Sequence, residues 1–494
     1  MKVRFICCTL AAAMLLCACQ ASVESPDLTE SPPALEQSEP EAPSSDGGIE
    51  QEEPEEDDRM PLLPPAPPVC ELDFTETESF PFPFEDELRV SYLQYPPRLL
   101  LTTEQALYDY DTMWQLLEEN YPYFEAIKRE LGIDWEEVKA EYRQILEGHA
   151  SRGHIWQADF IQTIMGCLNT FQAVGHLFPL VRSFRLDLLD GCKNNPNAPF
   201  PNLYKIHTNP KSELFYQYEQ RLRYPGSSGS NSDPKKDEPV SIEGLTAISE
   251  QLSVGYAEGR APYLKITSFH QWDDAAQAEL EDFFSSISQE EHLIIDVRGN
   301  GGGSDGAWMS GIVPFLAQQE YEFIRFFAAK SGSLNLWLEP EFDKSRGRFT
   351  RYTDDSWQKE FPYISPDMVT GMDIFLKVSS TLRCADVPDK FYGKIWVLVD
   401  KYCYSATDEL ACFCKETGFA TLVGTETGGN GKGAQPYIMA LPYSGLLVEY
   451  EPYLSFNADG TCNGTSGTVP DIVTEDGSDA LETCLMVING RLNY

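Results

Sequence analysis

The sequence is poor in positive charge. Its 494 residues include 37 lysines and arginines against 78 aspartates and glutamates, so the formal net charge is −41. Proteins that bind nucleic acids or anionic membrane surfaces do so through clusters of Lys and Arg. Much of the acidic excess lies outside the N-terminal tail, and we therefore expect neither nucleic acid nor an anionic lipid surface as a partner.

Paired cysteine motifs are also absent. The 13 cysteines contain no CxxC pair, and those beyond residue 19 number nine, which is odd. Structural zinc sites and disulfide frameworks usually need such pairs or an even count. We expect no zinc site, no full disulfide framework, and no metal or organic cofactor. Cys412 and Cys414 are expected to be packed free thiols.

Long apolar segments are missing too. The apolar run from Phe5 to Leu16 follows Lys2 and Arg4 and is shorter than the roughly 20 residues that span a bilayer. This pattern predicts an export signal over residues 1–18. The segment from Leu16 to Cys19 resembles the lipobox of bacterial lipoproteins. The resemblance implies that Cys19 is lipidated and attaches the chain to the outer side of the bacterial membrane. An ordinary secretory signal is the alternative.

Residues 19–70 are rich in Glu, Asp, Pro and Ser, with an acidic run at Glu52–Asp58. Such a segment buries too little apolar surface to offset its ordering entropy. Its like charges also repel one another. We expect a disordered acidic tether.

Residues 71–184 predict a helical N-terminal domain. Thr102 and Gln105 stand in capping-box positions before a helical apolar stripe, and a second helix begins at Asp134 with Glu137 as its matching acid. A third helix is expected around residues 160–168. Residues 185–244 are weakly patterned and are expected to connect this domain to the next.

Residues 245–494 show a different pattern, in which short apolar strands alternate with helices. This alternation predicts an α/β sheet with crossover helices. The whole chain is thus expected to be a mixed α/β protein. The strands are expected at residues 263–266, 293–297, 395–399 and 421–423, and the helices at 273–287 and 406–417.

Two segments of this region carry chemistry. The first, Asp296–Gly303, is a strand end followed by a glycine-rich turn, in which backbone N–H groups can approach a ligand closely. The second, Ser405–Glu409, places a serine hydroxyl at the start of a helix after another strand. A loop rich in donors beside such a serine is what acyl transfer requires.

These segments resemble the tail-specific, or C-terminal processing, serine proteases, which include the tricorn core. Asp296–Gly303 and Ser405–Glu409 match the family hallmarks, and Val423–Gly429 and Val469–Ile472 match later ones. The resemblance implies a crotonase-like or ClpP-like core and a serine-type endopeptidase that acts on polypeptides. No PDZ carboxylate loop is recognisable in residues 185–244, so the chain is closer to the tricorn-like branch.

The resemblance also implies site residues. Ser405 would be the nucleophile, and the amides of Gly302 and Ala406 would hold the oxyanion. Taken alone, Ser405 could equally be a helix N-cap that bonds an amide of the next turn.

A serine hydroxyl needs a base near neutral pH. In the tricorn-like branch a histidine from the N-terminal region acts as the base, and His176 stands where that motif belongs. In the other branch a lysine does so. Aligned without gaps, Asn430 occupies the lysine position, and Lys432 follows it in what would be an exposed turn. Lys432 is the alternative base. For His176 as base, activity should rise between pH 6 and 7.

One departure from the tricorn-like branch concerns the base. That branch has a glutamate shortly before the segment Val469–Ile472 to orient the histidine, but residues 463–466 offer only neutral groups. The sequence therefore predicts an exported, lipid-anchored serine endopeptidase working through an acyl-enzyme. The alternative is a catalytically impaired relative that acts as a peptide-binding or scaffolding lipoprotein. The peptide substrate and the oligomeric state stay open.

Overall fold

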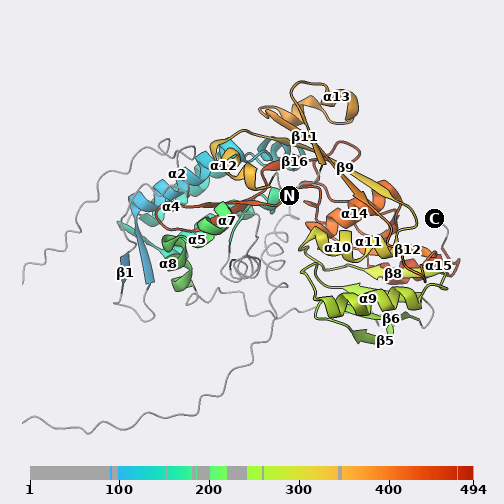
Figure 1. The fold of residues 1–494 in the computed structure, drawn as a ribbon. Helices are drawn as coiled ribbons and strands as arrows, with labels where there is room; N and C mark the ends of the chain where they lie inside the picture. Colours follow the sequence, from blue (N-terminus) through green and yellow to red (C-terminus); the bar gives the residue numbers. More distant parts are fainter. Residues whose placement is uncertain are drawn as a thin grey trace, which may run out of the picture.

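The structure is a computed structural model that describes residues 89–91, 98–150, 153–180, 185, 201–219, 242–258, 261–342, 348–475 and 477–492. The expected signal peptide, Cys19, the whole of the expected tether and much of the connecting segment lie outside these residues. Among the described helices, none is both long and apolar enough to cross a bilayer. Figure 1 shows a helical part, coloured blue to green, on one side and a large sheet with its helices on the other.

The large sheet forms the centre of the C-terminal part. Within the described residues it has seven strands in the order β17-β13-β12-β8-β7-β6-β5. The strands from β17 to β7 run parallel, whereas β6 pairs antiparallel with both β7 and β5. The strands are β5 (Ile242–Ala247), β6 (Leu252–Ala257), β7 (Ala261–Ile266), β8 (His292–Asp296), β12 (Lys394–Val399), β13 (Thr421–Gly424) and β17 (Ile472–Val473).

Helices cover both faces of this sheet. Ile295 of β8 faces a core shared with α9, α10, α11 and α14, whereas Ile294 faces a core shared with α15. The parallel strands are joined by crossover helices, α9 between β7 and β8 and α14 between β12 and β13, which confirms the predicted mixed α/β fold. The helices are α9 (Asp274–Ser286), α10 (Asp305–Gly311), α11 (Val313–Leu316), α14 (Ala406–Thr417) and α15 (Ala480–Ile488).

The helical part contains the three predicted helices. Thr102 and Gln105 form the predicted capping box of α2, and Asp134 accepts bonds from the first amides of α4. The weak pattern of residues 185–244 concealed two short helices, α7 and α8. The elements are β1 (Arg89–Ser91), β2 (Arg98–Thr102), α2 (Thr103–Asn120), α3 (Phe124–Ala126), the π-helix η2 (Ile127–Leu131), α4 (Trp135–Ala150), β3 (His154–Trp156), α5 (Gln157–Asn169), the 3-10 helix η3 (Val174–His176), α7 (Pro201–His207) and α8 (Pro210–Glu219).

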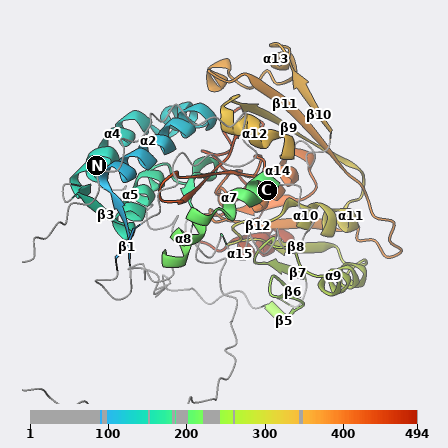
Figure 2. The same ribbon diagram turned by 60° about the vertical axis from the view of Figure 1, so that its left-hand side comes forward.

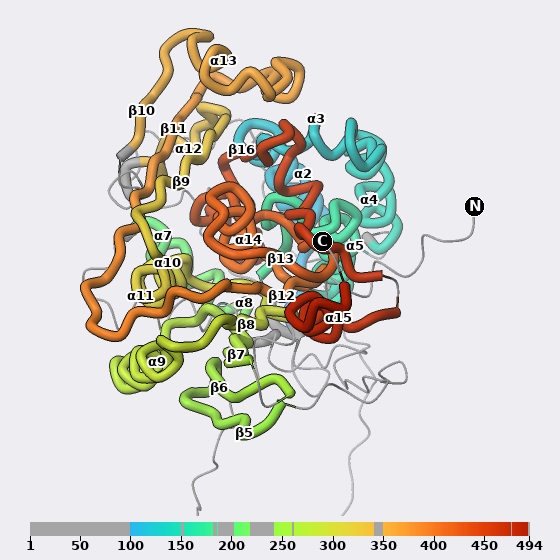
Figure 3. Tube along the Cα trace, turned by 90° about the vertical axis from the view of Figure 1, so that its right-hand side faces the viewer, coloured from blue at the N-terminus to red at the C-terminus, as the bar shows by residue number. Residues whose placement is uncertain are grey.

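Antiparallel strands link the helical part to the large sheet. Trp114 of α2, Phe327 of β9 and Tyr450 of β15 belong to one continuous core. Figure 2 shows β9, β10 and β11 beside the helical part, and Figure 3 shows α13 at the outer end of β10 and β11. The remaining elements are β4 (Phe178–Pro179), β9 (Tyr321–Ala329), α12 (Ser333–Phe342), β10 (Arg348–Tyr352), α13 (Trp357–Glu360), the 3-10 helix η4 (Pro366–Val369), β11 (Ile374–Leu382), β14 (Tyr437–Ala440), β15 (Leu447–Tyr450) and β16 (Tyr453–Ser455).

One of these pairings brings distant segments together. β4 pairs with β15, so that Phe178 lies opposite Glu449. The end of the helical part is therefore held beside residues that are some 270 positions later in the chain.

Candidate active site

Ser405 stands on a sharp turn between β12 and α14. Its φ of 55° and ψ of −130° lie outside the regions that residues with a side chain usually adopt. The Ser405 N–H donates to the Gly429 carbonyl at 3.0 Å, but the side chain makes no capping bond to the helix. The interpretation of Ser405 as a simple N-cap is therefore wrong.

The Ser405 hydroxyl faces a histidine from the helical part. His176 Nε2 lies 3.1 Å from Ser405 Oγ, within hydrogen-bond distance. The His176 side chain is buried, and this burial lowers its pKa to about 4. The imidazole is therefore neutral at pH 7 and able to accept a proton from the hydroxyl.

A tight loop carries His176. Ala173, Gly175 and His176 all have positive φ. A Cβ on Gly175 would lie 2.7 Å from ring carbons of Tyr123, so the loop packs too closely for a side chain there. The Tyr404 hydroxyl, from the residue before the serine, donates to the Ala173 carbonyl at 2.8 Å.

A carboxylate lies on the other side of the imidazole. Glu451 Oε2 is 3.9 Å from His176 Nδ1, and the Glu451 side chain is 1% exposed. Glu451 Oε1 accepts bonds from the amides of Ala434 and Tyr453, and the Glu451 N–H donates to the Gly175 carbonyl at 2.6 Å. These bonds fix the carboxylate beside the histidine.

Sequence reasoning missed Glu451. The family pattern directed attention to residues 463–466, which carry no acid, whereas the fold brings the Glu451 carboxylate beside His176 from the end of β15. The neutral character of residues 463–466 therefore does not leave His176 without a neighbouring carboxylate. A signal was available, because Glu449 and Glu451 interrupt a strongly apolar stretch at residues 446–456, and a carboxylate is almost never fully buried unless it has a partner.

The glycine loop reaches Ser405 from the neighbouring strand β8. A Cβ on Gly302 would lie 2.8 Å from Ser405 Cβ and 3.2 Å from the Ala406 nitrogen. The Gly302 N–H, however, donates to Asn300 Oδ1 at 2.9 Å, and its carbonyl accepts from Phe269. Gly302 and Ala406 are thus adjacent, but the Gly302 amide bonds within its own loop.

The charged residues of the same motif support the loop. Arg298 donates to both carboxylate oxygens of Asp296, and Tyr263 and Lys265 also donate to this carboxylate. Burial opposes ionisation of Asp296, but the bonds and charges of Arg298 and Lys265 outweigh it and lower the Asp296 pKa to about 2. Asp296 is therefore a charged anchor for the loop.

Lys432 occupies a different environment from the one expected. The side chain is buried rather than exposed in a turn, and its ammonium forms an ion pair with Glu416. The Lys432 N–H donates to Asn463 Oδ1 at 2.8 Å. Among the contacts of the described residues, none joins Lys432 to Ser405.

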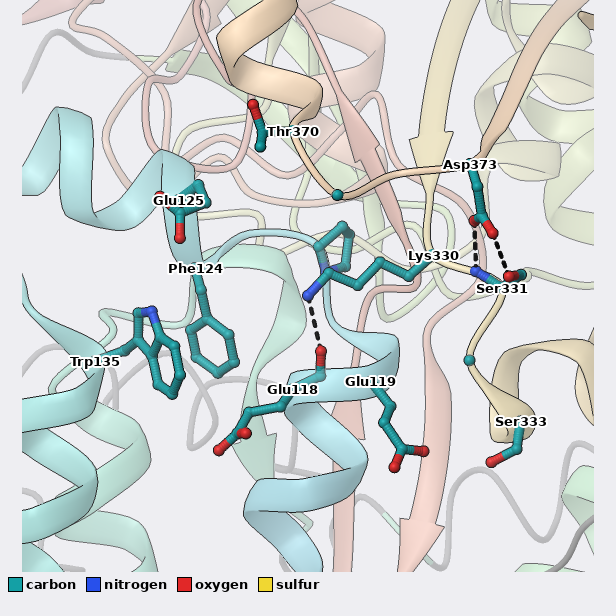
Figure 4. A pocket seen from close by; sticks show the side chains of 13 residues that line it. Glu118, Glu119, Phe124, Glu125, Trp135, Lys330, Ser331, Ser333, Thr370 and Asp373 are labelled. Carbon is teal, nitrogen blue, oxygen red and sulfur yellow. Dashed lines mark hydrogen bonds between the residues drawn. The ribbon is translucent and has the colours of Figure 1, made fainter.

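A cavity of about 720 Å³ lies elsewhere, between α2, α3 and the segments that follow β9 and precede β11. Figure 4 shows Lys330 in this cavity, where its ammonium donates to the Glu118 carbonyl, and Asp373 accepting two bonds from Ser331. None of the residues that line the cavity belongs to the Ser405 and His176 site.

The cysteines of the described residues are free thiols. Cys412 and Cys414 are both buried in α14, as predicted. Burial is the main reason that the pKa of each thiol lies well above its usual value. These thiols are therefore packing groups rather than reactive ones.

The solved structures that this chain is similar to share little sequence with it. A candidate peptidase from Parabacteroides merdae is 16% identical, with 79% of this chain and 97% of that chain covered and a TM-score of 0.47. Mature CPAF complexed with lactacystin is 15% identical, with 75% and 94% covered and a TM-score of 0.45. The photosystem II D1 C-terminal processing protease is 15% identical, with 75% and 93% covered and a TM-score of 0.35. No curated protein matches the sequence significantly.

Family models give the assignment. Residues 103–154 match the tricorn protease C1 domain, which places a tricorn-like module over α2 and α4. Residues 260–474 match peptidase family S41, and this range contains both the glycine loop and Ser405. The chain therefore carries a peptidase family S41 domain over residues 260–474, with a tricorn protease C1 domain ahead of it.

Proposed function

We propose that this S41 peptidase is an endopeptidase in which Ser405 is the nucleophile and His176 the general base. The observation that carries the proposal is the 3.1 Å separation of Ser405 Oγ and His176 Nε2. A nucleophile and a base within hydrogen-bond reach are the core of a serine peptidase site. The alternative base, Lys432, has no comparable contact and is paired with Glu416.

Glu451 completes the arrangement as the residue that orients the base. Its carboxylate favours a proton on His176 Nδ1, which leaves the Nε2 lone pair directed at the serine hydroxyl. The separation of 3.9 Å is longer than a hydrogen bond. Such bonds are often long in a site without substrate and shorten in the reacting complex.

The reaction then follows the acyl-transfer sequence. Ser405 Oγ bonds to the scissile carbonyl carbon while its proton passes to His176 Nε2. Collapse of the tetrahedral intermediate breaks the C–N bond, and the same proton goes to the departing amine. A water molecule, deprotonated by His176, then hydrolyses the Ser405 ester and releases the acid.

The oxyanion formed in these steps needs amide donors. The Ala406 N–H at the start of α14 and the Gly302 N–H are the proposed pair, since Gly302 lies against both Ser405 and Ala406. The Gly302 amide must leave Asn300 Oδ1 to serve this role. Loss of one such donor typically costs about a hundredfold or more in rate.

The experiment that tests the proposed function is reaction with a fluorophosphonate probe followed by peptide mapping. We expect the folded protein to be labelled at Ser405, the Ser405→Ala variant to be unlabelled, and the His176→Ala variant to react much more slowly. A folded protein that neither reacts with the probe nor cleaves a denatured polypeptide would be a catalytically impaired relative, and the proposal would be wrong.

We further propose that the peptidase is exported and anchored by lipid at Cys19. The supporting features are the lipobox-like sequence that ends at Cys19 and the acidic tether after it. Because one acyl chain anchors only marginally, the diacylglyceryl group should dominate. In a bacterial host, the unaltered chain should partition with membranes and Cys19→Ala should not. Mass spectrometry of a mature N-terminus beyond residue 19 without lipid would contradict this.

A further inference from the structure

Gly429 and Asn430 are consecutive residues that bond, respectively, to the proposed nucleophile and to the residue before the proposed base. The Gly429 carbonyl accepts the Ser405 N–H at 3.0 Å. Asn430 Oδ1 accepts the N–H of Gly175 at 2.5 Å, and Gly175 directly precedes His176. Two consecutive residues therefore tie the serine turn to the histidine loop, although about 230 positions separate those two segments in the chain.

This connection is rigid because Asn430 is itself held on several sides. Its backbone N–H donates to the Asn463 carbonyl at 3.0 Å, and its side-chain amide lies 3.5 Å from the Gly464 carbonyl. Asn430 is buried and has a φ of 61°, a left-handed conformation that asparagine tolerates better than most residues.

The support extends back to the serine helix through Asp408. This buried carboxylate lies in the first turn of α14 and accepts the Gly431 N–H at 3.0 Å and the Asn463 side-chain amide at 2.9 Å. It also accepts the backbone and hydroxyl of Thr468. The helix that begins after Ser405 thus fixes the loop that holds Asn430, and Asn430 holds the loop that carries His176.

We propose that Asn430 is a positioning residue that sets the separation of His176 Nε2 from Ser405 Oγ by accepting the Gly175 N–H. This inference rests on the proposed function of the two side chains. Asn430 occupies the position at which the lysine branch of the family carries its base, as the ungapped alignment of the sequence indicates. In place of that lysine, this chain carries Asn430, whose side-chain oxygen fixes the position of His176 through the Gly175 N–H.

The physical reason is the sensitivity of proton transfer to geometry. The histidine loop is a local turn whose backbone bonds fix its shape, and its place beside Ser405 depends on contacts from other segments. The Tyr404 and Tyr121 hydroxyls and the Glu451 N–H bond to its carbonyls, and Asn430 is the acceptor for the Gly175 N–H. Loss of the Asn430 acceptor leaves a buried N–H unpaired and frees the loop to shift. A displacement of about 1 Å can lower the rate by about a hundredfold.

The test compares two substitutions at the same position. Asn430→Gly suits the positive φ and removes the acceptor, whereas Asn430→Asp keeps an acceptor oxygen at the same place. We expect Asn430→Gly to lower kcat by about tenfold to a hundredfold with KM changed by less than about threefold. Asn430→Asp should retain at least about five times more of kcat than Asn430→Gly.

Asp109→Ala provides the matched control. Asp109 is also fully buried and also accepts loop amides, those of Tyr443 and Ser444 at 2.7 Å, but it has no contact with the histidine loop. The Asp109→Ala substitution should lower the midpoint of thermal unfolding, while kcat of the folded variant should stay within about twofold of that of the unaltered protein. This outcome separates a loss of positioning from a general loss of stability.

The outcomes also separate this inference from the proposed function. If the unaltered protein is not labelled by the fluorophosphonate at Ser405, the proposed function itself is wrong. If the unaltered protein is labelled but folded Asn430→Gly reacts and turns over at the same rate, Asn430 is not a positioning residue. Equal losses in the Gly and Asp variants would also overturn the inference, because the retained acceptor would then have no effect.

Discussion

The two halves of the site are built in different ways. The serine half consists of two strand ends, β8 with the glycine loop and β12 with Ser405, which are neighbours in one parallel sheet with Leu398 opposite Asp296. The histidine half is gathered from the end of the helical part, from Glu451 after β15, and from Asn430. Its members meet only through tertiary contacts.

This difference explains why the serine half can be recognised from a sequence motif and the histidine half cannot. In the serine half, each residue follows a strand directly, so its place depends on a short stretch of sequence. In the histidine half, the positions of His176 and Glu451 depend on the pairing of β4 with β15 and on bonds from distant loops. If the two halves act as one unit, damage to either should abolish activity.

The largest effect is expected from removing either member of the central pair. Ser405→Ala and His176→Ala should each lower kcat/KM by at least about a thousandfold, and the double variant should be no worse than either single one, because members of a catalytic unit fail together. Steady-state cleavage of an unstructured peptide measures this. If the losses in activation free energy of the two single variants add up in the double variant, the two halves act independently.

The second largest effect is expected from Gly302→Ala, which should lower kcat/KM by about a hundredfold or more. The new Cβ would lie 2.8 Å from Ser405 Cβ, and the φ of 111° disfavours any side chain. Gly301→Ala is the matched control, since no atom lies within 4 Å of a Cβ there. Peptide cleavage and thermal unfolding should be measured on both variants. Equal activity of the two would mean that close approach of the glycine loop is not needed.

Glu451→Gln tests the orienting carboxylate. The substitution keeps an oxygen for the amides of Ala434 and Tyr453 but removes the negative charge beside His176, and we expect kcat to fall by about tenfold to a hundredfold. Glu449→Gln is the control. Burial, together with the neighbouring Glu451, raises the Glu449 pKa to about 8, so this group is largely protonated at pH 7 and glutamine resembles it. A similar loss in both variants would contradict a specific role for Glu451.

The pH dependence should differ from that of an exposed imidazole. Burial lowers the His176 pKa to about 4, and a general base works only when unprotonated. We therefore expect kcat/KM to be level from pH 7 down to about 5 and then to fall about tenfold per unit below pH 4. From the sequence alone, activity was expected to rise between pH 6 and 7. Because His176 binds protons less readily when folded, stability should decrease as pH falls from about 6.5 to 4, so circular dichroism must accompany the rates.

Much of the fold and the serine half could be predicted from the sequence. The capping box at Thr102, the strands that precede Gly299 and Asp400, and the helix from Ala406 all follow from local rules of capping and periodicity. The position of Ser405 followed from the same local pattern. The strained φ of that residue and the absence of a capping bond could not be read from it.

The histidine half could be predicted only in part. The family pattern indicated His176, but Glu451 was sought in the wrong segment because its approach to the imidazole depends on the register of β15 against β4. The burial of Lys432 was missed for a similar reason, since a Gly-Lys-Gly sequence looks like an exposed turn until β9 and α14 pack around it. In each case a long-range contact decides the environment of the side chain.

The smallest effect on activity is expected at Lys432, where the histidine and lysine branches of the family make opposite predictions. Lys432→Met removes an ammonium that pairs with Glu416, so folding should be weakened by about 2 kcal/mol or more, because Glu416 loses its partner. Adding Glu416→Gln should recover part of that loss. The kcat/KM of folded Lys432→Met should stay within about threefold of the unaltered enzyme, because His176 is the base. An inactive but folded Lys432→Met, beside a His176→Ala variant that still turns over, would make Lys432 the base and remove the functional link between Ser405 and His176.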